Sequence, residues 1–341
     1  MNQRERQTYW KKTERLKRQF DAKYMDAIYQ SIIKQFKRFG RDLEAIGKDA
    51  AISRLGLDLW ERELIATFEK MYKDIAVTFG NSVYRALKIE ANQKGETFGF
   101  NAEWTKQVLD FLMAKGFVLV ADITDTTKKK MEAIVKQGIE QGFGVDKIAR
   151  LFLQDEDLKG FLTIKDIQGY AMMRAKRIVR TEVNRASNFG AMQGASAHPF
   201  YVDKIWISAR DSRTRRIPAD EFDHVEMDNQ VKPFDEPFTS TGKKGEPVMA
   251  MQPGDLSAPA GFTINCRCSV GFIPLRDANG RLKMKPRLNQ PKIRGTESNT
   301  AACSIPVNGM NFPEAAQHKN AIIEPNPKRK LPKDNFLLLL N

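Results

Sequence analysis

Apolar residues recur at helical spacing through the first half of the chain. One stripe, four residues apart, predicts a long helix within residues 1–50 and consists of Leu16, Phe20, Tyr24, Ile28, Ile32 and Phe36. Steps of three and four predict a second helix from about Ile52 to Ala91. We interpret the first stripe as a core-packing face, in preference to a dedicated DNA-binding helix, because such stripes usually face a core.

Further helices are predicted before residue 200. The pattern favours helices over Trp104–Val120, over a segment through Met131 and Ile139, and over a short segment capped by Asp146. A long helix is predicted from Thr163 to Ala191.

The pattern changes after residue 200. Residues Lys204–Ser208 mix polar ends with β-branched and aromatic side chains, which predicts a short strand that is at least half buried. A polar elbow, Asp211–Arg216, follows, and an Asp at a turn entry can accept hydrogen bonds from backbone N–H groups two residues on. Frequent Pro and Gly from residue 233 to residue 261 predict loops and short strands.

These elements predict an α+β fold in three parts. Residues 1–160 form an elongated helical region with a basic N-terminal arm, and residues 161–275 form a small, loop-rich α+β domain with short antiparallel strands. Residues 276–341 carry 12 Lys and Arg against 5 Asp and Glu and form a basic, extended tail. Its apolar tip, Phe336–Leu340, is predicted to dock on the chain's own core or on a partner.

Charge narrows the class of partner. A net charge of +14 over 341 residues, with a pI near 9.6, favours an anionic partner, and binding to a polymer of phosphates would be salt-dependent and blind to sequence. The alternative is a basic protein that binds nothing anionic tightly. No segment resembles a signal peptide, and Phe336–Leu340, the longest apolar run, is too short to span a membrane, so we expect synthesis in a cytoplasm.

The sharpest chemical signal is a pair of cysteines. Cys266 and Cys268 are two residues apart, so in an extended chain both thiols point to one face and Arg267 to the other. His224 is the natural third ligand of a metal, and the residue types favour a structural zinc. A one-residue gap is shorter than the usual zinc spacing, so the chain must bend between the sulfurs.

Two interpretations of this pair stay open. In the first, Asp211 or Asn265 orients the histidine or fills the fourth position of the zinc site. In the second, the cysteines are small buried apolar residues and the histidine is a hydrogen-bonded loop residue. A disulfide between such close neighbours is disfavoured by its geometry, and three cysteines form no disulfide framework.

Several short motifs occur in a defined order between residues 165 and 275. They are Arg180-Thr181-Glu182, Trp206-Ile207-Ser208, Asp211-x-Arg213-Thr214-Arg215, His224, Pro237-Phe238, Pro253-Gly254-Asp255, Pro259 and Asn265-Cys266-Arg267-Cys268. In this order they resemble the phage Mu F-like family of minor head proteins, also called head morphogenesis proteins. The resemblance implies a low-copy virion protein inside the capsid of a tailed phage, associated with the portal protein and other head proteins. Some family members leave the capsid with the DNA.

The motif residues are assigned structural roles, and we expect no enzymatic activity. Arg180 and Glu182 are predicted to tie their helix to the elbow by charge-assisted bonds, with a catalytic Glu182 as the alternative. Packaged double-stranded DNA is expected to be contacted without sequence preference. The main alternative function is a metal-dependent nuclease or an ejected toxin that uses His224 with Asp211. A nucleic-acid-binding protein of another kind would explain the charge but not the ordered motifs.

Overall fold

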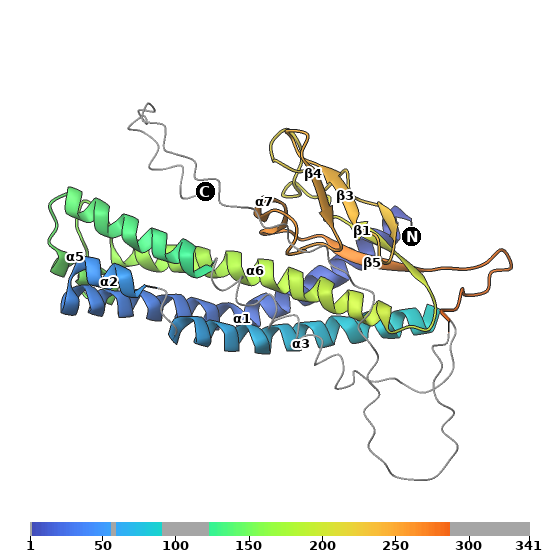
Figure 1. The fold of residues 1–341 in the computed structure, drawn as a ribbon, viewed down its shortest axis with the longest axis horizontal. Helices are drawn as coiled ribbons and strands as arrows, with labels where there is room; N and C mark the ends of the chain where they lie inside the picture. Colours follow the sequence, from blue (N-terminus) through green and yellow to red (C-terminus); the bar gives the residue numbers. More distant parts are fainter. Residues whose placement is uncertain (1, 56–58, 91–122, 287–341) are drawn as a thin grey trace, which may run out of the picture. The chain divides into compact units, whose positions relative to one another are not determined.

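The computed structural model describes residues 2–55, 59–90 and 123–286 (Figure 1). The predicted helix over residues 104–120 and the predicted apolar tip lie outside them. Helices make up the first part, followed by short strands, which confirms the α+β class. Among the described helices, none is long and apolar enough to cross a membrane.

The helices follow the predicted periodicity closely. They are α1 (Gln3–Ile46), α2 (Lys48–Arg54), α3 (Leu59–Glu90), a helix over residues 123–140, α5 (Val145–Leu153) and α6 (Ile164–Ser196). Asn2 and Glu5 form a capping box that starts α1, and Gly47, at φ 78°, ends it. Tyr24, Ile28, Ile32 and Phe36 are buried, so the predicted stripe is a core face.

Two predicted helix boundaries were wrong. The segment predicted as one helix from Ile52 is two, because Leu55 takes an extended backbone (ψ 124°) as the C-cap of α2, and α3 begins only at Leu59. The N-cap of α5 is Gly144, and Asp146 instead lies in the first turn, where its charge complements the helix dipole.

Helix α6 packs against α3 through two glycines. A Cβ atom at Gly190 would lie 2.4 Å from the backbone oxygen of Ala76, and one at Gly194 would lie 2.3 Å from that of Gly80. Only residues without a Cβ permit this approach, so the glycines set how closely the two helices lie. The apolar face of α6 also contributes to the core shared with α1 and α5.

The small sheet has the antiparallel order β2-β1-β5, formed by β1 (Val202–Ile207), β2 (Val231–Pro233) and β5 (Ser269–Pro274). Strands β3 (Phe238–Thr241) and β4 (Pro247–Ala250) form a separate hairpin, and α7 (Ala260–Thr263) is one short turn. Trp206, Phe238 and Phe262 are fully buried at the centre of this second core. Strand β1 is almost entirely buried, as predicted for residues 204–208.

Helix α6 contributes to both cores. Val179 and Ala186 belong to the helical core, whereas Ala191 and Ala195 belong to the core beside the strands. The helix therefore connects the helical region to the domain that carries the ordered motifs. The predicted domain boundary near residue 160 stays a prediction.

Candidate metal centre

The predicted cysteine and histidine residues converge in the structure. The Nδ1 atom of His224 lies 3.5 Å from the sulfurs of both Cys266 and Cys268. One candidate ligand atom from each residue falls within 4.8 Å of the others, and all three side chains are buried. The arrangement brings two thiols and one imidazole to a single point, as a zinc ion requires.

The chain bends between the two cysteines. Strand β5 begins only at Ser269, so Cys266 and Cys268 precede the flat ladder. Asn265 has a left-handed backbone (φ 57°), and the N–H of Cys266 donates to the backbone oxygen of Thr263 at 3.1 Å. This turn lets sulfurs two residues apart face one histidine.

Aromatic rings and the elbow hold His224 in place. Its backbone N–H donates to the oxygen of Arg215 at 3.1 Å. Its ring centroid lies 4.5 Å from that of Phe262 and 5.8 Å from that of Trp206. On this side of the ring the surroundings are apolar, which strengthens an interaction of the imidazole with a cation or a thiolate.

The two thiols differ in acidity. A hydrogen bond from Cys268 holds the pKa of Cys266 well below its ordinary value, while burial raises the pKa of Cys268 well above it. Both cysteines are free of disulfide bonds. A metal ion needs two thiolates, so its binding must expel the proton that Cys268 retains.

Of the two residues considered for the fourth position, Asp211 has its carboxylate bound elsewhere and Asn265 is held through its backbone. Asp211 accepts two hydrogen bonds from the guanidinium of Arg267, at 2.6 and 2.5 Å. The backbone N–H of Asn265 donates to the hydroxyl of Thr181 at 3.0 Å. Among the described residues, the cluster that could hold a metal consists of His224 and the two cysteines. These ligand types fit zinc, which thiolate and imidazole ligands both favour.

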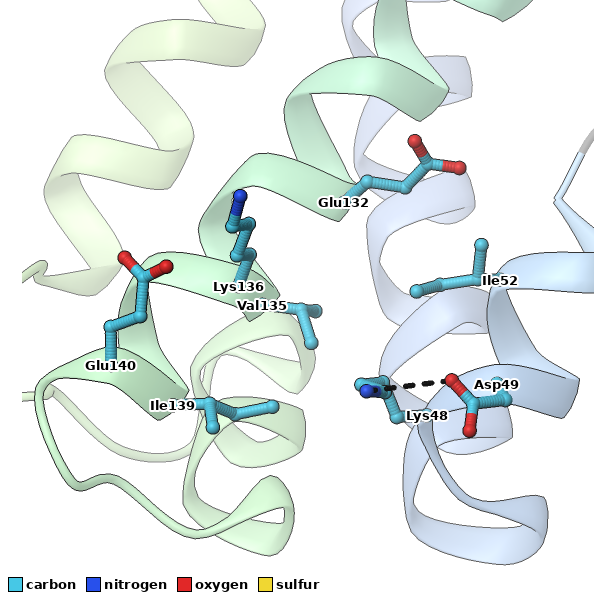
Figure 2. Close-up of a pocket in the computed structure, with 8 residues that line it drawn as sticks. All are labelled: Lys48, Asp49, Ile52, Glu132, Val135, Lys136, Ile139 and Glu140. Carbon is cyan, nitrogen blue, oxygen red and sulfur yellow. Dashed lines mark ion pairs between the residues drawn. The ribbon is translucent and has the colours of Figure 1, made fainter. Parts of the chain in front are cut away.

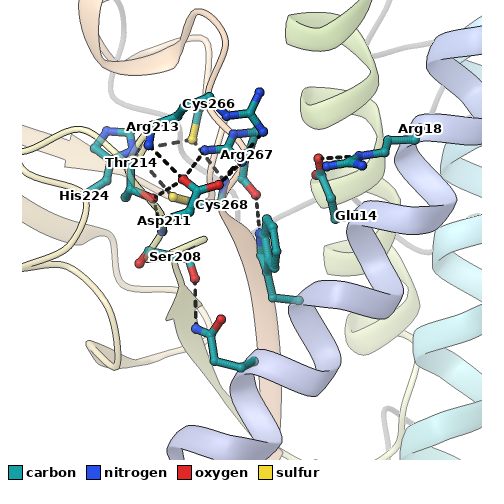
Figure 3. A network of polar contacts seen from close by, with 12 residues as sticks. Glu14, Arg18, Ser208, Asp211, Arg213, Thr214, His224, Cys266, Arg267 and Cys268 are labelled. Atoms are coloured by element: carbon teal, nitrogen blue, oxygen red, sulfur yellow. Dashed lines mark hydrogen bonds and ion pairs between the residues drawn. The ribbon is translucent and has the colours of Figure 1, made fainter.

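Asp211 organises the elbow as predicted, and its side chain also contacts Arg267 in the cysteine loop (Figure 3). Its carboxylate accepts from the backbone N–H of Arg213 at 3.1 Å, and its own N–H donates to the hydroxyl of Thr214 at 3.1 Å. Hydrogen bonds from Arg267 lower its pKa. Arg215 donates to the backbone oxygens of Phe262 and Ile264. The elbow is thereby tied to the loop that carries the cysteines.

Glu182 has partners other than the predicted ones. Its carboxylate accepts from Arg185, within α6, at 2.5 Å and from the hydroxyl of Tyr72 on α3 at 2.6 Å. Arg185 also donates to the backbone oxygen of Gly254 at 2.9 Å. The expected tie from Arg180 and Glu182 to the elbow was therefore wrong: Glu182 connects α6 to α3, Arg185 reaches the Pro253-Gly254 loop, and Arg180 is exposed.

Two further motif residues have structural partners. Asp255 accepts from the N–H of Met251 at 2.6 Å and from the N–H of Ser257 at 2.9 Å, which closes the loop after β4. Trp206 is fully buried, and its ring lies edge-on to Phe238 with centroids 5.3 Å apart. Both residues therefore shape the core around the cluster without ligating it.

Helix α1 contacts the cysteine loop through residues that the sequence pattern did not single out. Lys17 is buried, and its ammonium donates to the side chain of Asn184 (2.6 Å), the backbone oxygen of Cys268 (3.2 Å) and the hydroxyl of Ser269 (2.9 Å). The indole N–H of Trp10 donates to the backbone oxygen of Arg267 at 2.9 Å. Burial lowers the pKa of Lys17 to about 8.

The three cluster residues line one wall of a cavity of about 160 Å³. Its other lining residues are Ala209, Arg213, Thr214, Arg215, Asp220, Asn265 and Arg267. A wider concavity, of about 480 Å³, lies between α2 and the helix over residues 123–140 (Figure 2). Its apolar surface is formed by Ile52, Val135 and Ile139, and its other lining residues are charged. It contains neither a thiol nor an imidazole.

Comparison with known proteins supports the resemblance. The model of the family described as Phage Mu protein F like protein matches residues 129–271. This range runs from the helix over residues 123–140 into β5 and contains the three cluster residues, the elbow and Glu182. No curated protein and no solved structure matches the chain. Residues 129–271 are thus a Mu F-like region, and the family suggests a phage head morphogenesis protein.

Proposed function

We propose that this chain is a minor head protein of a tailed phage and acts inside the capsid near the portal protein. The observation that carries the proposal is the family match over residues 129–271, which contains every one of the ordered motifs. The motif residues make structural contacts: Glu182 and Asp211 both pair with arginines. We therefore assign the region a role in assembly and no catalytic activity.

Purified heads test this assignment. The heads come from the phage that carries this gene, and mass spectrometry of full particles should find the chain in few copies. Particles triggered to release their DNA should lack it if it leaves with the DNA. Cross-linking in full particles should join it to the portal protein. Absence of the chain from heads would contradict the proposed function.

The zinc proposal concerns structure. A zinc ion held by His224, Cys266 and Cys268 would cross-link the loop after the elbow to the loop before β5, and zinc undergoes no redox change. Small, loop-rich domains gain folding free energy from such an ion. Its removal should loosen both loops, as measured by hydrogen exchange with and without a chelator.

The proposed DNA contact is supported by charge. The chain carries a net charge of +14, and Lys11, Arg15 and Arg18 are exposed at successive turns on one face of α1. The logarithm of the affinity for double-stranded DNA should fall linearly with the logarithm of the salt concentration. The affinity should not depend on the DNA sequence. Fluorescence anisotropy with two unrelated duplexes at several salt concentrations measures both.

One observation favours the alternative, a metal-dependent nuclease. Three protein ligands beside a cavity are the arrangement of catalytic zinc sites, which keep one position for water or substrate. Against it, Asp211, the expected partner of His224, is bound to Arg267. Incubation of the zinc-loaded chain with supercoiled and linear DNA decides between the head protein and the nuclease. Cleavage of the DNA by wild type, lost in His224→Ala, would favour the nuclease.

A further inference from the structure

The cavity beside the cluster offers room for a ligand that the described residues do not supply. His224, Cys266 and Cys268 all line it, so an ion bound to them would face it with its remaining tetrahedral position. Its volume of about 160 Å³ exceeds the share of a single liquid water, about 30 Å³. A ligand larger than water therefore fits beside the ion.

One carboxylate, that of Asp220, also lines the cavity. It accepts a hydrogen bond from the backbone N–H of Arg216 at 3.0 Å. It does not belong to the group of ligand atoms that converge on His224. No further thiol, imidazole or carboxylate of the described residues thus converges on the cluster, and the fourth position is open to a ligand from outside the chain.

The histidine can present one of its two ring nitrogens to an ion. His224 is 2% exposed, and its Nε2 atom has no hydrogen-bond partner. With Nδ1 facing the sulfurs and the ion, Nε2 carries the proton and is a donor. The Nε2–H bond points away from an ion at Nδ1, so the charges around the cavity, and not the histidine, decide which ligand takes the fourth position.

The charges around the cavity favour an anion. Three arginines line it, and Asp211 neutralises one of them, Arg267. Arg215 donates to backbone oxygens, and Arg213 makes a long ion pair, 3.9 Å, with Asp211. A zinc ion with two thiolates and a neutral imidazole has no net charge, so these guanidinium groups outweigh the carboxylate of Asp220.

We propose that the fourth position of the metal centre is an exchangeable site for a phosphate group, held by the ion and by Arg213 and Arg215. Phosphate oxygens match the forked donors of arginine, and zinc also accepts oxygen ligands. The proposal rests on the metal centre under Proposed function. Through this site the Mu F-like region would contact a phosphate group directly, such as one on a nucleic-acid backbone. The site is separate from the exposed cations of α1.

Cobalt substitution tests the site without relying on activity. Co²⁺ replaces zinc in the full chain carrying Cys303→Ser, which removes the one cysteine outside the described residues, and visible absorption reports its ligands. Inorganic phosphate should shift the spectrum saturably, and acetate at equal ionic strength should do so much more weakly. Arg213→Gln should leave the phosphate-free spectrum unchanged and weaken phosphate binding about two- to five-fold, because the side chain is 59% exposed and screened. Arg38→Gln, an exposed arginine on α1, is the matched control and should change nothing.

The outcomes separate the two proposals. If no cobalt binds, the metal centre itself fails. If cobalt binds but phosphate leaves its spectrum unchanged, the site is closed and the phosphate proposal is overturned. In that case a spectral change in Asp220→Asn would identify Asp220 as the fourth ligand. An equal response to acetate and phosphate would also overturn the assignment to phosphate.

Discussion

The ammonium of Lys17 donates a hydrogen bond, 3.2 Å long, to the backbone oxygen of Cys268. This contact joins α1, which precedes the family match at residue 129, to the loop of the candidate metal centre. It places a buried cation beside two thiols, where burial lowers its pKa to about 8. The burial of protonated Lys17 therefore costs free energy at neutral pH. Its hydrogen bond also makes the position of the cysteine loop dependent on α1.

The lowered pKa of Lys17 predicts a pH-dependent stability. Between pH 8 and 10.5 the unfolded chain keeps the proton that the folded chain loses, so the free energy of unfolding rises with pH there. The slope attributable to Lys17 is about 1.4 kcal/mol per pH unit, and the total is about 3 kcal/mol. In urea denaturation without metal, the free energy of unfolding of wild type should rise with pH more steeply than that of Lys17→Met, by this slope. Lys11→Met, at an exposed position, should follow wild type, and equal slopes for Lys17→Met and wild type would contradict the account.

Substitution of the cluster should abolish stabilisation by zinc. At a free zinc concentration 100 times the dissociation constant, wild type should gain about 2.7 kcal/mol, whereas His224→Ala and Cys266→Ser should gain none. His198→Ala is the matched control, because His198 is equally buried but bonds to the backbone oxygen of Tyr84. That variant should lose about 1 kcal/mol and keep the full increment from zinc. Thermal denaturation with and without zinc measures both, and an increment retained by His224→Ala would contradict the cluster.

The contact between α3 and α6 should not tolerate a methyl group. Gly190→Ala would place its Cβ 2.4 Å from a backbone oxygen, and we expect a loss of about 1–3 kcal/mol. Gly169→Ala, in the same helix, meets nothing within 4 Å and should stabilise the chain by about 0.5–1 kcal/mol. Opposite signs in denaturant melts are the predicted result. A neutral Gly190→Ala would mean that the helices do not lie this close.

The pair between Asp211 and Arg267 should make the elbow sensitive to acid. Because the pKa of Asp211 is lowered, its contribution is present above the ordinary pKa of about 3.9 and disappears as pH falls below it. The side chain of Asp211 is 37% exposed, so Asp211→Asn should cost about 1 kcal/mol at pH 7. The difference from wild type should vanish in acid. Arg213→Gln, which loses only a 3.9 Å pair, should cost less, and equal losses would refute the assignment.

Residue patterns predicted the elements and the shared direction of the two thiols because both depend on short-range spacing, whereas His224, 42 positions before Cys266, was assigned from its residue type. The apolar stripe of α1 marked its core face, and the spacing of Cys266 and Cys268 marked a shared direction for two thiols. The partners of the charged motif residues were not predictable in this way. Asp211 meets Arg267 across 56 positions and Glu182 meets Tyr72 across 110, and such contacts depend on how whole elements pack.

Buried polar residues on helices also escaped sequence reasoning. A lysine within an amphipathic helix is expected to be solvated, so nothing in the periodicity set Lys17 apart from the exposed cations around it. The packing role of Gly190 and Gly194 could not be predicted for a related reason. In the sequence alone, a glycine within a helix only lowers helix propensity. Its role in close packing requires knowledge of the partner helix.

The metal content of the purified full-length chain tests the central claim most directly. Native mass spectrometry of protein prepared without chelator should show one zinc ion per chain, and Cys268→Ser should show none. A folded wild-type chain that binds no zinc on titration, or a zinc count unchanged by Cys268→Ser, would contradict the assignment of His224, Cys266 and Cys268 as a metal centre.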